Sequence, residues 1–386
     1  MTGAGLSRRA LLGGAAQAAV ALGLSAAPSR ILAASNQRRI SAFGRDGVAL
    51  QRAFDWAHET HGTLLLDREV VVDRTVFMGN LHLVDAGGRI LILADDNYTR
   101  PPKESPRGWA AISMRSAPKN PYYAEPITRR YLVRIERGCR IDFLRTNPHK
   151  PHYPMRFTGL RDGSYIYPDF TARSTIDSDC NGPDWYFYNR CRIGGTYSLT
   201  FDRGRPTGGF WLRDVDEERL GSAYYSRLEL DDPVFRKIGG HDECVAIFTT
   251  FDDPGHLRAS GSLTVAQSNS LGFSILNRSK APPKDFQINL DRVVVSSTVR
   301  DNQPVAKIDD DFASIGSLEA TVTGEASGTN GAAVLVCENR SGTSSSPRIG
   351  SARLASKGGG ARGYRNTVAM RGRCAIDRSA ISELTR

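Results

Sequence analysis

One segment near the N-terminus has the hydrophobic pattern of an amphipathic helix. Within residues 46–57 the apolar positions recur three or four residues apart, so they share one face of a helix with about 3.6 residues per turn. These apolar positions are Ala49, Leu50, Ala53, Phe54 and Ala57. The spacing predicts a single α-helix here, and no later segment has a helical pattern of comparable quality.

After this helix the pattern changes to short apolar runs separated by Gly, Asn and Asp, which is typical of β-strands and turns. The clearest runs are 62–66, 70–72, 81–84, 89–93, 132–135, 228–230, 245–248, 262–266, 286–290, 293–296, 318–322 and 332–336. Comparable runs recur at a loose spacing of about 20 to 30 residues, without a strict repeat. The string predicts an all-β fold: sandwich, barrel, propeller or β-solenoid.

The segment 317–336 has the rhythm expected of one solenoid coil, namely strand, turn, small residues and strand. Small residues suit inward positions where successive strands stack about 4.8 Å apart. We therefore expect residues 35–386 to form a single domain. The Ser- and Gly-rich stretch that begins at residue 341 favours an irregular C-terminal cap over 341–386.

The first 34 residues have the pattern of a twin-arginine signal peptide. Ser7-Arg8-Arg9 precedes an apolar run that ends near Leu24, and small residues follow through Ala34. The run is shorter than the roughly 20 residues that span a bilayer, so an uncleaved anchor is the less favoured alternative. We expect a periplasmic or secreted protein without stable membrane insertion after signal cleavage.

The net charge and the motifs that the sequence lacks narrow the classes of partner to expect. The chain has 51 Lys and Arg against 41 Asp and Glu, a net charge of +10, so an exported form is expected to meet an anionic surface or polymer. No recognition helix or RNP-like segment indicates nucleic acid, and no CxxC, HExxH, Walker or strand-linked GxGxxG motif indicates a metal or cofactor. The oligomeric state is not indicated.

The six cysteines are sparse and irregularly spaced: Cys139, Cys180, Cys191, Cys244, Cys337 and Cys374. A Cys180–Cys191 disulfide is one interpretation for an oxidising compartment. Buried free thiols are the favoured alternative, because a chain that folds in the cytoplasm before twin-arginine export does not need the bond.

The helical segment and the strands after it resemble the opening of the pectate-lyase-like family of right-handed parallel β-helices. In that family a helix of the type "D…ALQ.AID.A" caps the solenoid, and here 46–54 matches it. A "GG.L.LP.G.Y" strand then begins the first coil; His61-Gly62 stands at its Gly-Gly and Asp67-Arg68-Glu69 at its Pro-x-Gly turn. The resemblance implies an all-β, right-handed parallel β-helix (solenoid) with an N-terminal capping α-helix, and a carbohydrate substrate, without choosing a reaction.

The segment 240–247 resembles the "G-D-D-C-I-A-I" turn and strand of polygalacturonase-type β-helices, whose adjacent carboxylates supply acid and base. By this resemblance Asp242 matches the first carboxylate and Glu243 the second, with His241 as an insertion or replacement. The chain has no Gly-His-Gly or Arg-Ile-Lys to complete the set, so polygalacturonase activity itself is not indicated.

A second acidic group, Asp214 and Asp216, lies 26 to 28 residues before Asp242, close to the coil spacing. On neighbouring coils these carboxyl groups would raise one another's pKa and keep one protonated as a general acid. The alternative for each acid is that it is an ordinary residue of a solvated turn, without a catalytic role. Asp309-Asp310-Asp311 favours a loop, with calcium binding as its alternative.

Five further residues are candidates for substrate binding: Arg213, Arg236, Lys237, Trp185 and Trp211. The cations would stabilise the charge that develops beside a uronate in a lyase, or else form salt bridges. The tryptophans would offer a flat face to a sugar, or else pack in the core.

A basic stretch alternates with apolar residues and predicts one arginine-rich strand face, either a track for an acidic polymer or a solvated surface. Its arginines are Arg129, Arg130, Arg134, Arg137, Arg140 and Arg145.

Taken together, the sequence predicts an exported enzyme that cleaves an acidic polysaccharide by hydrolysis or β-elimination. The alternative is a non-catalytic carbohydrate-binding or cell-envelope protein of the same fold.

Overall fold

A computed structural model describes most of the chain beyond the predicted signal peptide. The described residues are 36–99, 110–115, 130–157, 159–186, 190–204, 206–213, 226–248, 257–276, 287–298, 305–309, 313–323, 335–338, 348–357, 368–371, 375–376 and 381–384. Within these ranges the protein is mostly β-structure, with one α-helix, α2 (Gly47–Thr60), and a short 3-10 helix, η1 (Ile40–Ala42). None of the described helices is long and apolar enough to cross a membrane.

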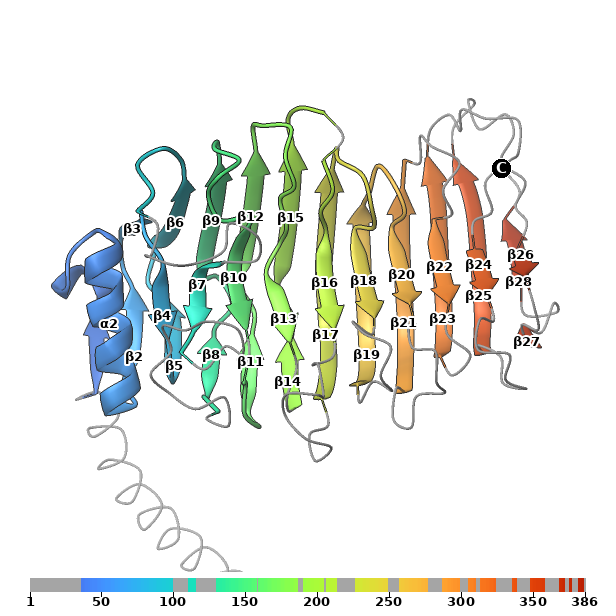
Figure 1. Ribbon diagram of the computed structural model, residues 1–386. Coiled ribbons are helices and arrows are strands. Elements are labelled where there is room, and N and C mark those ends of the chain that lie inside the picture. The colour runs from blue at the N-terminus through green and yellow to red at the C-terminus, as the bar shows by residue number, and fades with distance from the viewer. Residues whose placement is uncertain are drawn as a thin grey trace, which may run out of the picture.

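Helix α2 forms where the apolar spacing predicts it and continues to Thr60. It begins at Asp46, whose side chain accepts a hydrogen bond of 2.8 Å from the Ala49 amide, so the N-cap satisfies a free helix N–H. It ends at His61, which takes a left-handed conformation with φ 52°. The buried face packs against the first strands, at one edge of the sheets, and β28 lies at the opposite edge (Figure 1).

Among the described residues, all strand pairings are parallel, and the strands build two sheets. The smaller sheet has ten strands: β4 (Val76–Met78), β7 (Ala110–Met114), β10 (Tyr153–Phe157), β13 (Asp184–Tyr186), β16 (Phe210–Arg213), β18 (Val245–Phe248), β20 (Phe273–Leu276), β22 (Ala306–Asp309), β24 (Leu335–Glu338) and β26 (Val368–Arg371).

The larger sheet has eighteen strands: β1 (Gln37–Arg39), β2 (Thr63–Leu66), β3 (Glu69–Val72), β5 (Leu81–Asp85), β6 (Arg89–Ala94), β8 (Val133–Ile135), β9 (Arg140–Arg145), β11 (Ser164–Ile166), β12 (Asp169–Ser174), β14 (Arg190–Ile193), β15 (Thr196–Phe201), β17 (Ser226–Ile238), β19 (Leu257–Gln267), β21 (Gln287–Ser297), β23 (Ser314–Thr323), β25 (Arg348–Lys357), β27 (Ala375–Ile376) and β28 (Ile381–Leu384). Strands β25 to β28 extend the two sheets into part of the segment 341–386.

The chain alternates between the two sheets, and we call one strand of the smaller sheet together with the larger-sheet strands that follow it a layer (Figure 1). In the first layers the larger-sheet part is two short strands, and from β17 to β25 it is one long strand; in β17 and β19 the pairing shifts register near the middle of the strand, a point that we call the bend. The distance in sequence between paired positions varies, from 19 residues between Thr63 and His82 to 52 between His82 and Arg134. This variation explains why the sequence shows no strict repeat.

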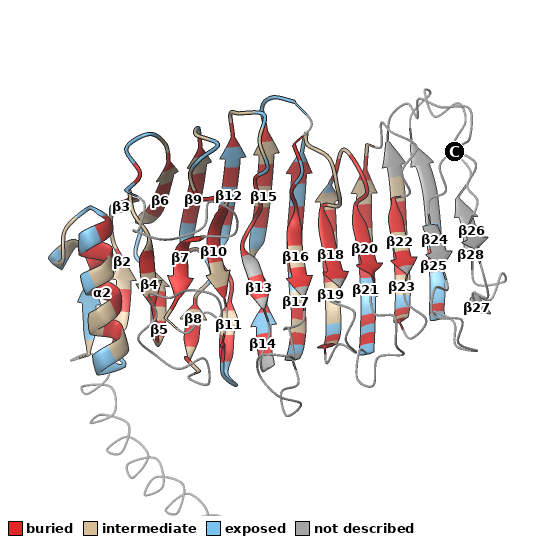
Figure 2. Cartoon of the chain, viewed as in Figure 1, coloured by how far each residue is buried: buried red, intermediate tan, exposed pale blue. Residues whose placement is uncertain are grey.

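The core lies between the sheets, because every second residue of each strand points inward (Figure 2). Aligned inward positions of neighbouring strands form columns, for example Phe157, Trp185, Leu212, Ile247, Ile275 and Ile308 across the smaller sheet. Aromatic side chains add specific packing, such as Tyr197 stacked on Phe235 with ring centroids 5.1 Å apart. The fold is therefore a parallel all-β arrangement with one main hydrophobic core, as the sequence predicts at this level of detail.

Candidate functional site

The predicted catalytic turn follows β17 and leads into β18. Gly239 and Gly240 have positive φ angles of 76° and 69°, and Asp242 has φ 67°. A left-handed conformation at a residue with a Cβ is uncommon and strained, and such residues persist where the surroundings hold them. The backbone around Asp242 is therefore held by specific contacts.

The main contact is the buried ammonium group of Lys237, near the end of β17. Its Nζ donates to the carbonyl oxygens of His241, Asp242 (2.8 Å) and Glu243 (3.4 Å). The side chain is 0% exposed. Burial lowers the pKa of Lys237 to about 8, although the nearby Cys244, Asp242 and Glu243 oppose that shift. Lys237 therefore anchors the turn.

Neighbouring layers fix the same turn from both sides. The His241 amide donates to the Pro206 carbonyl at 2.8 Å, and the Cys244 amide donates to the Leu271 carbonyl at 2.8 Å. The Ser270 hydroxyl donates to the Asp242 carbonyl. The backbone that carries the three predicted residues is consequently preorganised, which is what an active site needs from its supporting structure.

The side chains of His241, Asp242 and Glu243 are half-buried. Among the described residues, none makes a hydrogen bond or ion pair with these three side chains, whereas their three carbonyl groups and the His241 amide are hydrogen-bonded. The turn can thus present two carboxylates and an imidazole to a ligand. Asp214 and Asp216 lie outside the described residues, so their approach to Asp242 stays a prediction.

The predicted substrate-binding residues lie in different environments. Arg213 ends β16, in register with Phe248 of β18. Arg236 is exposed on the outer face of the larger sheet. Trp211 is half-buried on the outer face of the smaller sheet, where it packs against Ala246 and Leu276. Of these, Trp211 and Arg236 have side-chain surface that a saccharide can reach.

Two of the predicted substrate-binding residues are instead interior. Trp185 is 0% exposed and stacks on Phe157 with ring centroids 6.4 Å apart, so it has no face to offer a sugar. Lys237 is equally buried and donates to backbone carbonyls, so it cannot bind substrate directly. The correct interpretation is core packing for Trp185 and support of the turn for Lys237.

The basic stretch does not form a single exposed arginine face. Arg134 and Arg140 point outward from β8 and β9, but Arg145 points inward and is 2% exposed. Its guanidinium donates to the carbonyl oxygens of Asp179 and Pro148 (3.0 Å), and burial lowers its pKa. The prediction of one outward face is therefore wrong at Arg145, which supports a turn as Lys237 does. Arg129 lies outside the described residues.

The described cysteines are buried free thiols, and Cys180 and Cys191 are not bonded to each other. Burial raises the thiol pKa of Cys139, Cys180 and Cys244 to about 12 and also raises that of Cys191. Of the two interpretations, the structure supports free thiols for these residues. The thiol of Cys337 and all of Cys374 are outside the description.

Metal binding is not indicated within the described part of the chain, where no group of three or more His, Cys, Asp or Glu residues could hold an ion. Asp309 ends β22, and Asp310 and Asp311 lie outside the described residues. The calcium alternative for this segment stays a prediction.

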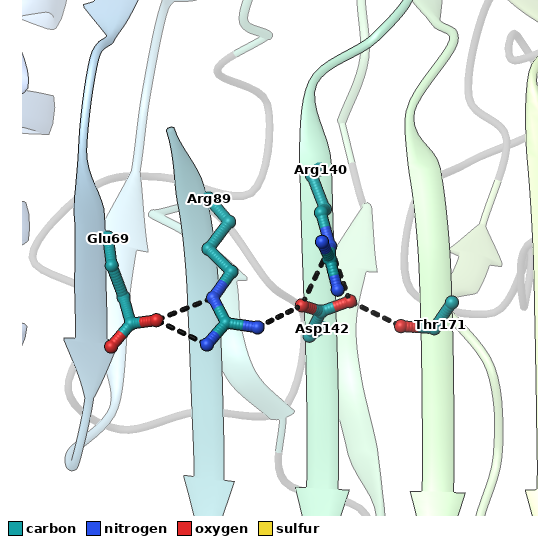
Figure 3. A network of polar contacts seen from close by, with 5 residues as sticks. All are labelled: Glu69, Arg89, Arg140, Asp142 and Thr171. Carbon is teal, nitrogen blue, oxygen red and sulfur yellow. Dashed lines mark hydrogen bonds and ion pairs between the residues drawn. The ribbon is translucent and has the colours of Figure 1, made fainter. Parts of the chain in front are cut away.

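A network that sequence reasoning missed crosses four strands of the larger sheet (Figure 3). Arg89 of β6 binds Glu69 of β3 and, at 3.1 Å, Asp142 of β9. Asp142 also binds Arg140 at 3.0 Å and accepts a hydrogen bond from Thr171 of β12. Because Asp142 is only 8% exposed and has three partners, the network ties strands together and leaves this carboxylate little capacity for a ligand.

A second missed group lies where the strands of the larger sheet bend, and we call it the bend cluster. Its members come from β5, β8, β11, β14, β17 and the turns after them: His82, Glu136, Arg137, Tyr165, Tyr167, Arg192 and Asp231. The available signal was the alternation of apolar and polar residues in 133–136, which places Arg134 and Glu136 on the outer face.

Comparison with known proteins gave no match to a family model, a curated protein or a solved structure.

Proposed function

We propose that this chain is an exported right-handed parallel β-helix protein of the pectate-lyase-like type that cleaves an acidic polysaccharide. The fold proposal is supported by the parallel pairing of successive layers, the alternation between two sheets and the helix at one end. The export proposal rests on the twin-arginine pattern around Arg8 and Arg9, which lies outside the described residues.

The observation that carries the enzymatic proposal is the anchored turn after β17. Lys237 is buried beneath it and binds three consecutive carbonyl groups, while the Asp242 and Glu243 side chains have no described partner. Exposed loops seldom receive such support unless their geometry matters, because burying an ammonium group without a carboxylate partner is costly. The turn is therefore our candidate catalytic element.

Two carboxyl groups can perform glycoside hydrolysis. One must be protonated to donate to the leaving glycosidic oxygen, and the other must be ionised to activate a water molecule or attack the sugar. Asp242 and Glu243 supply this pair in the proposal, and Trp211 offers an aromatic surface on β16, the strand next to β18. β-Elimination is the competing reaction within the same proposal.

The acidic nature of the polymer is supported by the positive charge of the chain, +10 overall, and by arginines such as Arg236 on the outer face of the larger sheet. A non-catalytic carbohydrate-binding or cell-envelope protein is the second candidate. It is favoured by the extent of the ion-paired outer face (Figure 3), which offers a polar surface without involving Asp242 or Glu243.

The test is incubation of the purified protein with a panel of uronate-containing and neutral polysaccharides. New reducing ends on uronate polymers without ultraviolet absorbance indicate hydrolysis, and reducing ends with an absorbing unsaturated product indicate β-elimination. Binding of the uronate polymers without new reducing ends would instead establish the non-catalytic candidate. Cleavage of neutral polymers alone would contradict the proposed substrate class.

A further inference from the structure

The bend cluster has one half in which a carboxylate organises the donors around it. Glu136 accepts a hydrogen bond from the Tyr165 hydroxyl, and its Oε1 lies 3.0 Å from His82 Nε2. The other ring nitrogen of His82 lies 3.0 Å from Thr63 Oγ1. Partial burial tends to raise the pKa of Glu136, but these contacts outweigh it and lower the pKa. Glu136 is therefore ionised at neutral pH and fixed in one orientation.

In the other half, two guanidinium groups flank one phenol. Arg137 lies 4.6 Å over the Tyr167 ring, and Arg192, which pairs with Glu229 at 2.8 Å, lies close enough to the Tyr167 hydroxyl to oppose the rise of its pKa. The Tyr167 hydroxyl donates to Asp231 at 2.8 Å, and Arg137 binds the same carboxylate at 3.2 Å. Burial and the bond to Asp231 raise the pKa of Tyr167 to about 12, so the hydroxyl stays protonated.

The backbone beside Asp231 is strained. Asp232 has a positive φ of 48°, whereas nearby strands pass the bend with glycines, Gly195 at 83° and Gly261 at 98°. A left-handed conformation is unfavourable for a residue with a Cβ, although Asp adopts it more readily than most residues do. Strain of this kind is a reason to look for a ligand.

We propose that the bend cluster binds one uronate unit of the acidic polysaccharide. Arg137 and Arg192, whose side chains are 66% and 47% exposed, direct guanidinium donors to the uronate carboxylate. Glu136 and Asp231 accept hydrogen bonds from the sugar hydroxyls. The inference rests on the proposed function for the class of polymer and adds a binding subsite separate from the catalytic turn.

The mixture of charges selects this ligand class over others. A polyphosphate or nucleic acid would meet the two carboxylates, Glu136 and Asp231, as like charges. A neutral sugar would use those acceptors but would leave Arg137 and Arg192 paired only with Asp231 and Glu229 of the protein itself. A uronate provides both an anion and neighbouring hydroxyl donors, so it uses both halves of the cluster.

The experiment is calorimetric titration of the full protein with a uronate oligosaccharide and with its carboxyl-reduced, neutral counterpart. The double variant Arg137→Gln/Arg192→Gln should bind the uronate oligosaccharide at least about tenfold more weakly than the wild type. The control is Arg292→Gln, which removes another exposed ion pair, that of Arg292 with Glu319 at 3.4 Å on the same sheet. It should bind within about twofold of the wild type, since surface pairs are worth little.

Unchanged affinity in the double variant, equal affinity for the charged and neutral oligosaccharides, or no binding by the wild type would each overturn the subsite. Thermal midpoints of all variants show that the affinities compare folded proteins. Asp242→Asn should lose cleavage and keep uronate binding, which separates the two proposals. If the wild type binds the uronate oligosaccharide but cleaves no polymer, the subsite stands and the enzymatic proposal is wrong. If the double variant cleaves the polymer with an unchanged KM, the enzymatic proposal stands and the subsite is wrong.

Discussion

At the scale of single residues, the described part of the interior holds two cations, Arg145 and Lys237, that donate hydrogen bonds to the backbone. Each points inward near the end of a larger-sheet strand and donates to the turn that follows, and Arg145 also donates to the Asp179 carbonyl. Carbonyl oxygens satisfy the donors but leave the positive charge unneutralised, so burial still penalises the charged form. The pKa of each is accordingly lowered.

Lys237 should therefore give the protein a pH-dependent stability of known sign. Its folded pKa of about 8 lies below the ordinary value of 10.5, so between these values the unfolded chain binds more protons. The free energy of unfolding should rise from pH 8 to pH 10.5 by up to about 3 kcal/mol from this residue. Urea unfolding at several pH values measures it, and Lys237→Met should lack the rise. Parallel profiles in the two proteins would show that Lys237 does not titrate in this range.

At the scale of elements, helix α2 and the most apolar strands follow from the sequence, and others do not. Strand β12 (Asp169–Ser174) was not predicted, because only Phe170 and Ala172 are apolar and its outward residues are polar or charged. The candidate site likewise contains residues that the sequence indicated and a residue whose role it did not indicate. Asp242 and Glu243 were found by motif, whereas the role of Lys237 required noticing that it shares the buried face of its strand with Phe235.

The cap of α2 can be tested directly. Asp46→Ala removes the acceptor for the Ala49 amide and should lower the free energy of unfolding by about 1 kcal/mol. Asp46→Asn is the matched control, because an amide oxygen can still accept that hydrogen bond and the loss should be much smaller. Urea unfolding followed by circular dichroism gives both values. Equal losses in the two variants would mean that Asp46 acts through its charge and not as a cap.

At the scale of the whole molecule, the layered arrangement brings side chains distant in sequence together. Arg137 and Asp231, 94 residues apart, form one ion pair in the bend cluster. The alternating hydrophobic pattern predicts strands but not which strands become neighbours, because inserted segments change the spacing from layer to layer. The bend cluster and the network around Asp142 were therefore beyond sequence reasoning, even though alternation could place some of their residues, such as Glu136 and Asp142, on an outer face.

The central claim is that the turn anchored by Lys237 performs chemistry on an acidic polysaccharide. The most direct measurement compares the rate of reducing-end formation from a uronate polymer in the wild type and in Asp242→Asn, with urea unfolding to compare their stability. The account predicts a loss of at least about a hundredfold in rate with nearly unchanged stability and unchanged binding in the bend cluster. An Asp242→Asn protein that cleaves the polymer at the wild-type rate would contradict it.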